Sequence, residues 1–287
     1  MSCGCSLLTS LDGLSGGEPR AGDDGGFDAP GDDATTSPDA RAGDSASADA
    51  RTEGDAAGSS RYASAVLGDN PLLYYRFGEP AGIPAKDEVT GTSIPYPVQG
   101  ITQGAAGGLL GDTNTAIALD GSGKLALTQS ADFAGIVPFS VEAWISRSPT
   151  TSAISFVVDH ESWSAGRIGW LFSAPPSGFG FERWGVVGGG AVNNSAGASE
   201  PTVAGEWHHV VGTFDGSASR VYVDGVRRGV YNAALPLESI GGSFAVGAQN
   251  CNCSDTGFAG ILDELAIYPH ALTEARILAH FNAGKNQ

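Results

Sequence analysis

Two short acidic motifs hold the carboxylates whose spacing comes nearest to supporting hydrolysis of a glycosidic bond. They are Asp159-His160-Glu161 and the adjacent pair Asp263-Glu264. A retaining glycosidase needs two carboxyl groups about 5 Å apart, one as nucleophile and one as acid and base. We expect Asp159 to end a strand and Glu161 to begin a polar loop, while adjacent strand residues point to opposite faces of their sheet. The sequence therefore predicts that the chain is not an enzyme.

Sugar binding is a second chemistry, in which an aromatic ring stacks on the sugar face and polar groups hydrogen-bond its hydroxyls. Trp163 stands in a polar segment and is the best candidate for an exposed platform. Arg167 follows four residues later, and three asparagines lie in segments that we expect to form loops at one rim: Asn193, Asn194 and Asn250. The alternative is that most aromatic side chains of this region fill a core.

His208 and His209 are adjacent and therefore point to opposite faces of a strand. That arrangement argues against joint metal ligation by the pair. We expect one ring to pack inside the domain and the other to lie at its rim.

The four cysteines form two Cys-x-Cys pairs. Cys251 and Cys253 lie in a polar segment, where a tight disulfide would stiffen a loop in an exported protein. Zinc needs about four ligands and this segment supplies two, so the disulfide is favoured. Metal binding is one alternative role of Cys3 and Cys5.

The N-terminal part of the chain is strongly acidic. Residues 1–58 hold 12 of the 32 acidic residues but only three of the 15 Lys and Arg, within a formal net charge of −17. Their Asp-, Ala-, Gly- and Ser-rich composition cannot bury enough apolar surface to offset the entropy of ordering. We expect residues 15–59 to be a disordered linker after a remnant of a signal and anchor at 1–14. This acidity argues against nucleic acid as a partner.

Residues 60–287 are predicted to form one all-β domain. Apolar and polar residues alternate in short runs separated by turn residues, which favours two packed antiparallel sheets. A short helix is expected at each end, over 61–67 and from Thr273 to Gly284. The predicted strands are 72–77, 115–119, 124–128, 139–146, 154–159, 168–173, 178–184, 209–214, 220–223, 243–247 and 260–268.

Four stretches carry a family resemblance. The run Glu206–Gly216, with Arg220–Gly225 after it, resembles the "WHHVAGTFDGS…VYVDG" stretch of laminin-G-like, concanavalin A-type jelly-roll domains. The opening run Tyr62–Gly82, the strand Phe139–Ile145 and the closing run Phe258–Gly284 are similar to the same family. The resemblance implies a two-sheet jelly-roll sandwich and a role in binding.

The resemblance also implies a structural calcium ion. In related modules, calcium commonly ties the acidic turn after the first strand to the closing strand. Carried over to this chain, the candidate ligands are Glu79 or Asp87, Asp120, and Asp263. An ion pair with Arg76 is the alternative explanation of Asp263.

The start of the chain, Ser2-Cys3-Gly4-Cys5, resembles the end of a bacterial lipoprotein signal, which implies that Cys5 is the acylated residue. Only four residues precede Cys5, so either the sequence begins inside a longer signal or the match is accidental. The expected protein is an exported lipoprotein at the cell surface or outer membrane that binds a glycan or glycoprotein without catalysis. A structural or protein–protein adhesion role is the alternative, and a glycoside hydrolase is the least favoured.

Overall fold

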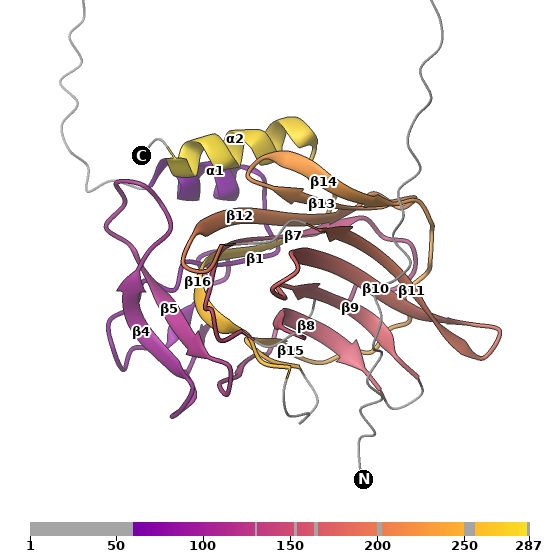
Figure 1. The fold of residues 1–287 in the computed structure, drawn as a ribbon, viewed down its shortest axis with the longest axis horizontal. Helices are drawn as coiled ribbons and strands as arrows, with labels where there is room; N and C mark the ends of the chain where they lie inside the picture. The colour runs from indigo at the N-terminus through magenta and orange to yellow at the C-terminus, as the bar shows by residue number, and fades with distance from the viewer. Residues whose placement is uncertain are drawn as a thin grey trace, which may run out of the picture. The chain divides into compact units, whose positions relative to one another are not determined.

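The computed structural model describes residues 60–129, 131–151, 154–163, 166–199, 203–249 and 256–285 (Figure 1). The predictions for the leader, Cys5, Asn250, Cys251 and Cys253 lie outside the described residues. Within the described ranges, neither helix has the length and apolar character needed to cross a membrane.

An eight-stranded antiparallel sheet forms one layer of the domain. Its centre consists of the β-branched and aromatic segments that the sequence predicts, because such side chains pack well on a pleated surface. In spatial order the strands are β14 (Val226–Tyr231), β13 (Ser219–Val223), β12 (Trp207–Phe214), β7 (Phe139–Arg147), β16 (Ala259–Tyr268), β5 (Thr115–Asp120) and β4 (Ile101–Ala106), with β1 (Leu73–Tyr75) paired to β16.

A six-stranded antiparallel sheet forms the second layer. Its order is β11 (Gly190–Ala198), β10 (Phe179–Val187), β9 (Ile168–Ser173), β8 (Phe156–Ser162), β15 (Phe244–Val246) and β6 (Leu125–Leu127). Two short strands, β2 (Ala85–Lys86) and β3 (Ser93–Ile94), pair with each other beside these layers. The predicted jelly-roll sandwich is confirmed.

The main core lies between the two large sheets. Alternate residues of β7, from Phe139 to Ile145, point into it and are fully buried. The Phe139 ring meets Phe133 at 4.3 Å, Phe181 at 5.3 Å and Trp170 at 5.6 Å between ring centroids, which joins the two layers. Residues of the opposite phase on β9 and β10 must therefore point to the outer face of the six-stranded sheet.

Two helices, α1 (Arg61–Gly68) and α2 (Glu274–Lys285), lie together over the outer face of the eight-stranded sheet (Figure 1). A second apolar cluster joins them to it, with Tyr62 and Ile277 packed with Trp144 of β7. Both described helices thus cover one sheet. In the described part of the chain, the outer face of the other sheet carries no helix.

A buried carboxylate lies beneath the two helices. Glu142 of β7 accepts hydrogen bonds from the hydroxyls of Tyr62 and Tyr268 at 2.8 and 2.6 Å. Its carboxylate is also 2.6 Å from His209 Nε2 and 3.0 Å from His280 Nδ1. Burial alone would raise the pKa of Glu142, but the two histidines outweigh it and hold this pKa well below its usual value. The anion ties β7, β12, β16 and both helices together.

Arg183 is an unusual member of the core. It occupies an inward position of β10, is fully buried, and lies with its guanidinium carbon 3.3 Å from the centroid of the Phe214 ring. Its NH2 group donates to the Leu235 carbonyl at 2.6 Å, while its Nε and NH1 groups have no hydrogen-bond partner among the described residues. Burial lowers the pKa of Arg183 to about 10.

We expect Arg183→Met to leave stability unchanged or to raise it by about 1 kcal/mol. A buried cation with one hydrogen bond does not recover its desolvation cost, and an apolar side chain of similar size removes that cost. Chemical denaturation of the full chain measures the effect. Arg227→Met, which removes an exposed ion pair with Glu274, is the control and should change stability by about 0.5 kcal/mol or less. A loss above about 2 kcal/mol in Arg183→Met would contradict this view of the core.

Candidate ligand-binding site

The outer face of the six-stranded sheet brings together residues from four strands. Glu161 of β8 lies opposite Gly169 of β9, Gly169 lies opposite Trp184 of β10, and Trp184 lies opposite Asn193 of β11. A second row beside it consists of Asp159, Leu171, Glu182 and Ser195. Directly opposed strand residues share a face, so both rows point away from the core.

Gly169 lies in the first row where its backbone comes close to the backbone of β8. Its φ is +117°, and a Cβ at this position would collide with the carbonyl oxygen of His160. Only glycine fits this close approach, so no side chain stands between Glu161 and Trp184, which are the neighbours of Gly169 in the row. Arg167, two residues before Gly169, reaches both of them. Its guanidinium carbon lies 3.8 Å from the centroid of the Trp184 ring.

Arg167 is held by two carboxylates. Its Nε and NH2 groups donate to the two carboxylate oxygens of Glu161 at 2.9 and 3.1 Å, and NH2 is 3.6 Å from Glu182 Oε2. Trp184 Nε1 donates to the same Glu182 oxygen at 3.0 Å. Burial and the nearby Asp159 raise the pKa of Glu161, and Arg167 opposes this shift. The cluster is thus rigidly cross-linked.

Trp163 provides the exposed aromatic surface of the cluster. The guanidinium of Arg167 lies 5.1 Å from the centroid of its ring, so the cation is near both tryptophans. Trp163 is 40% exposed, whereas Trp184 is 8% exposed. The expectation that Trp163 is exposed is confirmed. A cation within about 6 Å of an indole face is attracted to it, which helps to fix this ring.

The structure brings Trp163 and Arg167 together and places Asn193 on the same face. Asn193 and Asn194 lie in β11, so the expectation that they belong to loops is wrong. Asn194 points to the inner side of the sheet and is buried, so it does not reach this face. Sequence reasoning missed Glu182 as a member of the site, and it did not single out Trp184 among the aromatic residues of this region. The signal that could have found Glu182 and Trp184 was strand alternation. Phe179 and Phe181 of β10 point into the core, so residues 182 and 184 must point outward.

The expectation that Glu161 begins a loop is also wrong, because β8 continues to Ser162. Asp159 and Glu161 are therefore alternate residues on one face of one strand, the spacing that a carboxylate pair requires. Asp159 is fully buried and Glu161 is 4% exposed. Glu161 also accepts both hydrogen bonds from Arg167, which opposes its use as an acid or a nucleophile.

The expectation that Asp263 and Glu264 point to opposite faces of their strand is wrong. A β-bulge interrupts the pairing of β16 at this point, and Glu264 has a φ of +54°. Both carboxylates come within 3.4 Å of Asn114 Nδ2. Arg76 pairs with Glu264 at 2.7 Å and with Asp112 at 2.8 Å, whereas Asp263 accepts from the Gly108 amide at 2.9 Å. Arg76 therefore forms its ion pair with Glu264, and not with Asp263 as the sequence suggested.

The four candidate calcium ligands are each engaged by protein donors. Glu79 accepts from the Lys86 amide, Asp87 from the Tyr74 amide, Asp120 from Ser122, and Asp263 from Gly108. Among the described residues, no three His, Cys, Asp or Glu side chains gather in a way that could hold a metal ion. The calcium site stays a prediction, and thermal unfolding in calcium against EDTA tests it.

The two histidines are separated as expected. His209 is fully buried against Glu142, on the side of the helices. His208 is partly exposed, with its Nδ1 atom 2.9 Å from Asp224 Oδ2.

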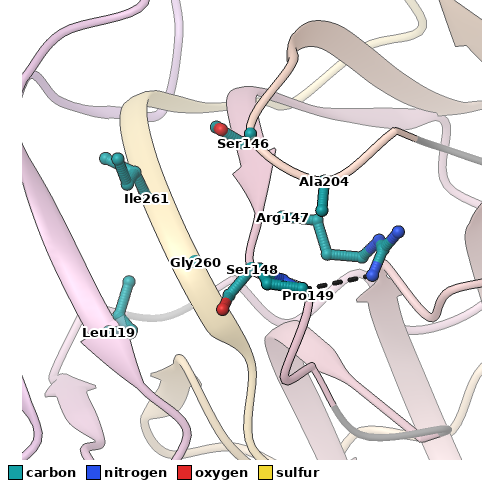
Figure 2. Close-up of a pocket in the computed structure, with 9 residues that line it drawn as sticks. Leu119, Ser146, Arg147, Ser148, Pro149, Ala204, Gly260 and Ile261 are labelled. Atoms are coloured by element: carbon teal, nitrogen blue, oxygen red, sulfur yellow. Dashed lines mark hydrogen bonds between the residues drawn. The ribbon is translucent and has the colours of Figure 1, made fainter.

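A separate open pocket of about 410 Å³ lies at the ends of β5, β7 and β16 in the other sheet (Figure 2). Its only charged lining residue, Arg147, donates to the Ser148 carbonyl at 3.1 Å. Leu119, Pro149 and Ile261 supply apolar surface, and no aromatic ring lines the pocket. It therefore lacks the stacking platform that Trp163 provides on the six-stranded sheet.

In a comparison with known protein families, residues 119–278 match the model of one family, described as the concanavalin A-like lectin/glucanases superfamily. No curated protein matches the chain. Among solved structures, domain 4 of AbnA, a GH43 extracellular arabinanase from Geobacillus stearothermophilus, in complex with arabinotriose, is similar. It has 19% identity and a TM-score of 0.54, with 75% of this chain and 98% of that chain covered.

Toxin binding domains have the same fold. The binding domain of Paraclostridial Mosquitocidal Protein 1 has 15% identity and a TM-score of 0.59, covering 76% of this chain and 53% of that one. The botulinum neurotoxin serotype D binding domain has 14% identity and a TM-score of 0.55, covering 76% and 52%. This chain thus spans about half the length of those toxin domains. At such identities the likeness shows the fold alone.

Proposed function

Because the chain belongs to the concanavalin A-like lectin/glucanases superfamily, we propose that it is a non-catalytic module that binds a glycan on the outer face of its six-stranded sheet. The observation that carries this proposal is the partly exposed Trp163, stacked near Arg167 beside a row of polar side chains. An aromatic ring packs against the apolar face of a sugar, and adjacent amide and carboxylate groups hydrogen-bond its hydroxyls.

The cluster suits this role because it is ordered before a ligand arrives. Glu161 and Glu182 hold Arg167 from its edge, while Trp184 lies against its face at 3.8 Å. A fixed platform loses little conformational entropy on binding, which favours affinity. The arabinanase domain with a similar fold binds arabinotriose according to its name, and that supports a sugar as the ligand here.

We further propose that the module is exported and held at a cell surface or outer membrane through an acylated Cys5. Residues 15–59, expected to be a flexible linker, would project the domain from the membrane. A linker of that length has a mean reach of about 35–40 Å. Labelling cells with a radioactive or alkyne fatty acid tests this, since Cys5→Ala should abolish incorporation into the protein.

Two other functions stand beside this one. A protein–protein adhesion role would use an apolar patch rather than a stacking ring with polar neighbours. A glycoside hydrolase is favoured by one observation, the shared face of Asp159 and Glu161, but burial and Arg167 oppose it. We expect no release of reducing ends from any polysaccharide that the chain binds.

We expect the full chain to bind at least one class of polysaccharide, and Trp163→Ala to weaken that binding by at least about tenfold, or 1.4 kcal/mol. Isothermal titration, after screening on a polysaccharide array in calcium and in EDTA, measures the change. Tyr231→Ala is the matched control, because Tyr231 is a 39% exposed aromatic residue on β14 of the other sheet. Unchanged affinity in Trp163→Ala, or an equal loss in Tyr231→Ala, would move the site elsewhere.

A further inference from the structure

The charge of the cluster narrows the class of ligand. We infer that this site takes an uncharged glycan and discriminates against polysaccharides that carry carboxylate or sulfate groups. This inference rests on the proposed glycan-binding function. It also assigns Arg167 a positioning role toward Trp163 in place of direct binding to an anion.

Arg167 has little capacity left for an anionic ligand. Two of its nitrogens already donate to Glu161, and NH2 also lies 3.6 Å from Glu182. Its face lies against Trp184 and near Trp163, and its side chain is only 13% exposed. A guanidinium binds a carboxylate best through two parallel donors on one edge. Glu161 occupies the edge formed by Nε and NH2, and the NH2 group, which belongs to both edges, also lies near Glu182.

The acceptor groups of the site face the ligand instead. Glu182 is 22% exposed at its side chain, and its contacts with Trp184 and Arg167, within the described part of the chain, both go to the Oε2 atom. Its other oxygen can accept a hydrogen bond from a sugar hydroxyl. Asn193 lies opposite Trp184 on the neighbouring strand and offers a further polar group on the same face.

The net charge of the site is negative. Asp159, Glu161 and Glu182 supply three carboxyl groups against the one guanidinium of Arg167. The site therefore stays negative even when the raised pKa of Glu161 leaves that group protonated, and it repels a carboxylate or sulfate on the ligand. The surrounding domain acts in the same direction, because residues 60–287 carry 20 acidic residues against 12 Lys and Arg. Like charges that meet across an interface weaken binding and reduce the encounter rate, whereas a neutral glycan is unaffected.

The test compares the full chain on neutral polysaccharides (arabinan, galactan, mixed-linkage β-glucan) and anionic ones (polygalacturonate, alginate, heparin) at low and high salt. We expect the chain to bind a neutral polysaccharide at least tenfold more tightly than an anionic one. This difference in affinity should become smaller at high salt, because salt screens the repulsion. Glu182→Gln removes one negative charge but keeps an oxygen that can accept the hydrogen bond from Trp184. This variant should therefore also reduce the difference in affinity between neutral and anionic polysaccharides. Glu274→Gln is the charge-matched control, because Glu274 is an exposed carboxylate on helix α2, which covers the eight-stranded sheet, and it should leave the difference in affinity unchanged.

Each outcome has a distinct meaning. Equal or tighter binding to an anionic polysaccharide would overturn the inference while leaving glycan binding in place. The inference would also be overturned if Glu182→Gln showed the same difference in affinity as the parent chain, because the repulsion would then arise elsewhere. If a folded chain, checked by circular dichroism, binds none of these polysaccharides, both the proposed function and the inference fail.

Discussion

Replacing Glu142 with Gln should destabilise the domain by about 3–5 kcal/mol, the range measured when one partner of a buried charged pair is removed. The substitution keeps the size of the side chain but turns an acceptor of several hydrogen bonds into an amide with two donors. Tyr62, Tyr268 and His209 would then compete for one remaining oxygen. Thermal unfolding should show a fall in melting temperature on the order of 10 °C.

The same network predicts a pH dependence. Burial lowers the pKa of His280, but Glu142 and Asp69 outweigh burial and raise it above its ordinary 6.5. The stability that comes from His280 is therefore complete below about pH 6.5 and is lost as the pH rises through the raised value. Glu142, whose pKa is lowered, contributes its full share above about pH 4.5 and loses it at more acidic pH.

His280→Gln isolates this effect. The stability difference between the parent chain and His280→Gln should be largest between about pH 4.5 and 6.5 and should shrink toward alkaline pH. Denaturation midpoints measured across that range give the difference directly. A difference that stays constant from pH 5 to pH 9 would show that His280 is not charged in the folded domain.

The second large effect is expected at Arg76. Arg76→Met should cost about 3–5 kcal/mol, because it leaves the buried carboxylate of Glu264 without its cation. Burial raises the pKa of Glu264 to about 7 even though Arg76 opposes that shift. A carboxyl group with a raised folded-state pKa favours folding as the pH falls, so the loss in Arg76→Met should be smaller at pH 5 than at pH 8.

A double variant provides the control for this prediction. Arg76→Met combined with Glu264→Gln removes the buried charge together with its partner, and should recover part of the lost stability. The Tyr74 hydroxyl, which donates to Glu264, can still donate to the glutamine oxygen. If the double variant is as unstable as the sum of the two single variants, the charge pair is not the source of the effect.

Sequence patterns predicted the central strands because their side chains alternate and carry strong β-propensity. β9 lies at 168–173 as predicted, and β7 and β16 differ from their predicted bounds by one residue at an end. β11 was not predicted, because Gly190–Ala198 consists mostly of Gly, Ala and Asn, which are poor strand formers. Its pairing with β10 along nine residues overrides that local preference.

The missed strands explain what was missed in the site. Once β11 is a strand, Asn193 and Asn194 must point to opposite faces, and only Asn193 joins the outer row. The polar end of β8 resembles a loop in sequence, but the ion pair between Glu161 and Arg167 supports it as a strand. The bulge at Glu264 also depends on distant residues, Tyr74 and Arg76, which no local pattern reveals.

The central claim is that a glycan binds on the six-stranded sheet at Trp163. The most direct measurement is an NMR titration of the full chain that follows the indole N–H resonances of the five tryptophans. The titrant is an oligosaccharide prepared from a polysaccharide that the chain binds. Assignment comes from single Trp→Phe variants. We predict that the Trp163 and Trp184 signals shift in parallel with binding, while those of Trp144 and Trp207, on the other sheet, do not. Shifts confined to Trp144 or Trp207 would contradict the claim.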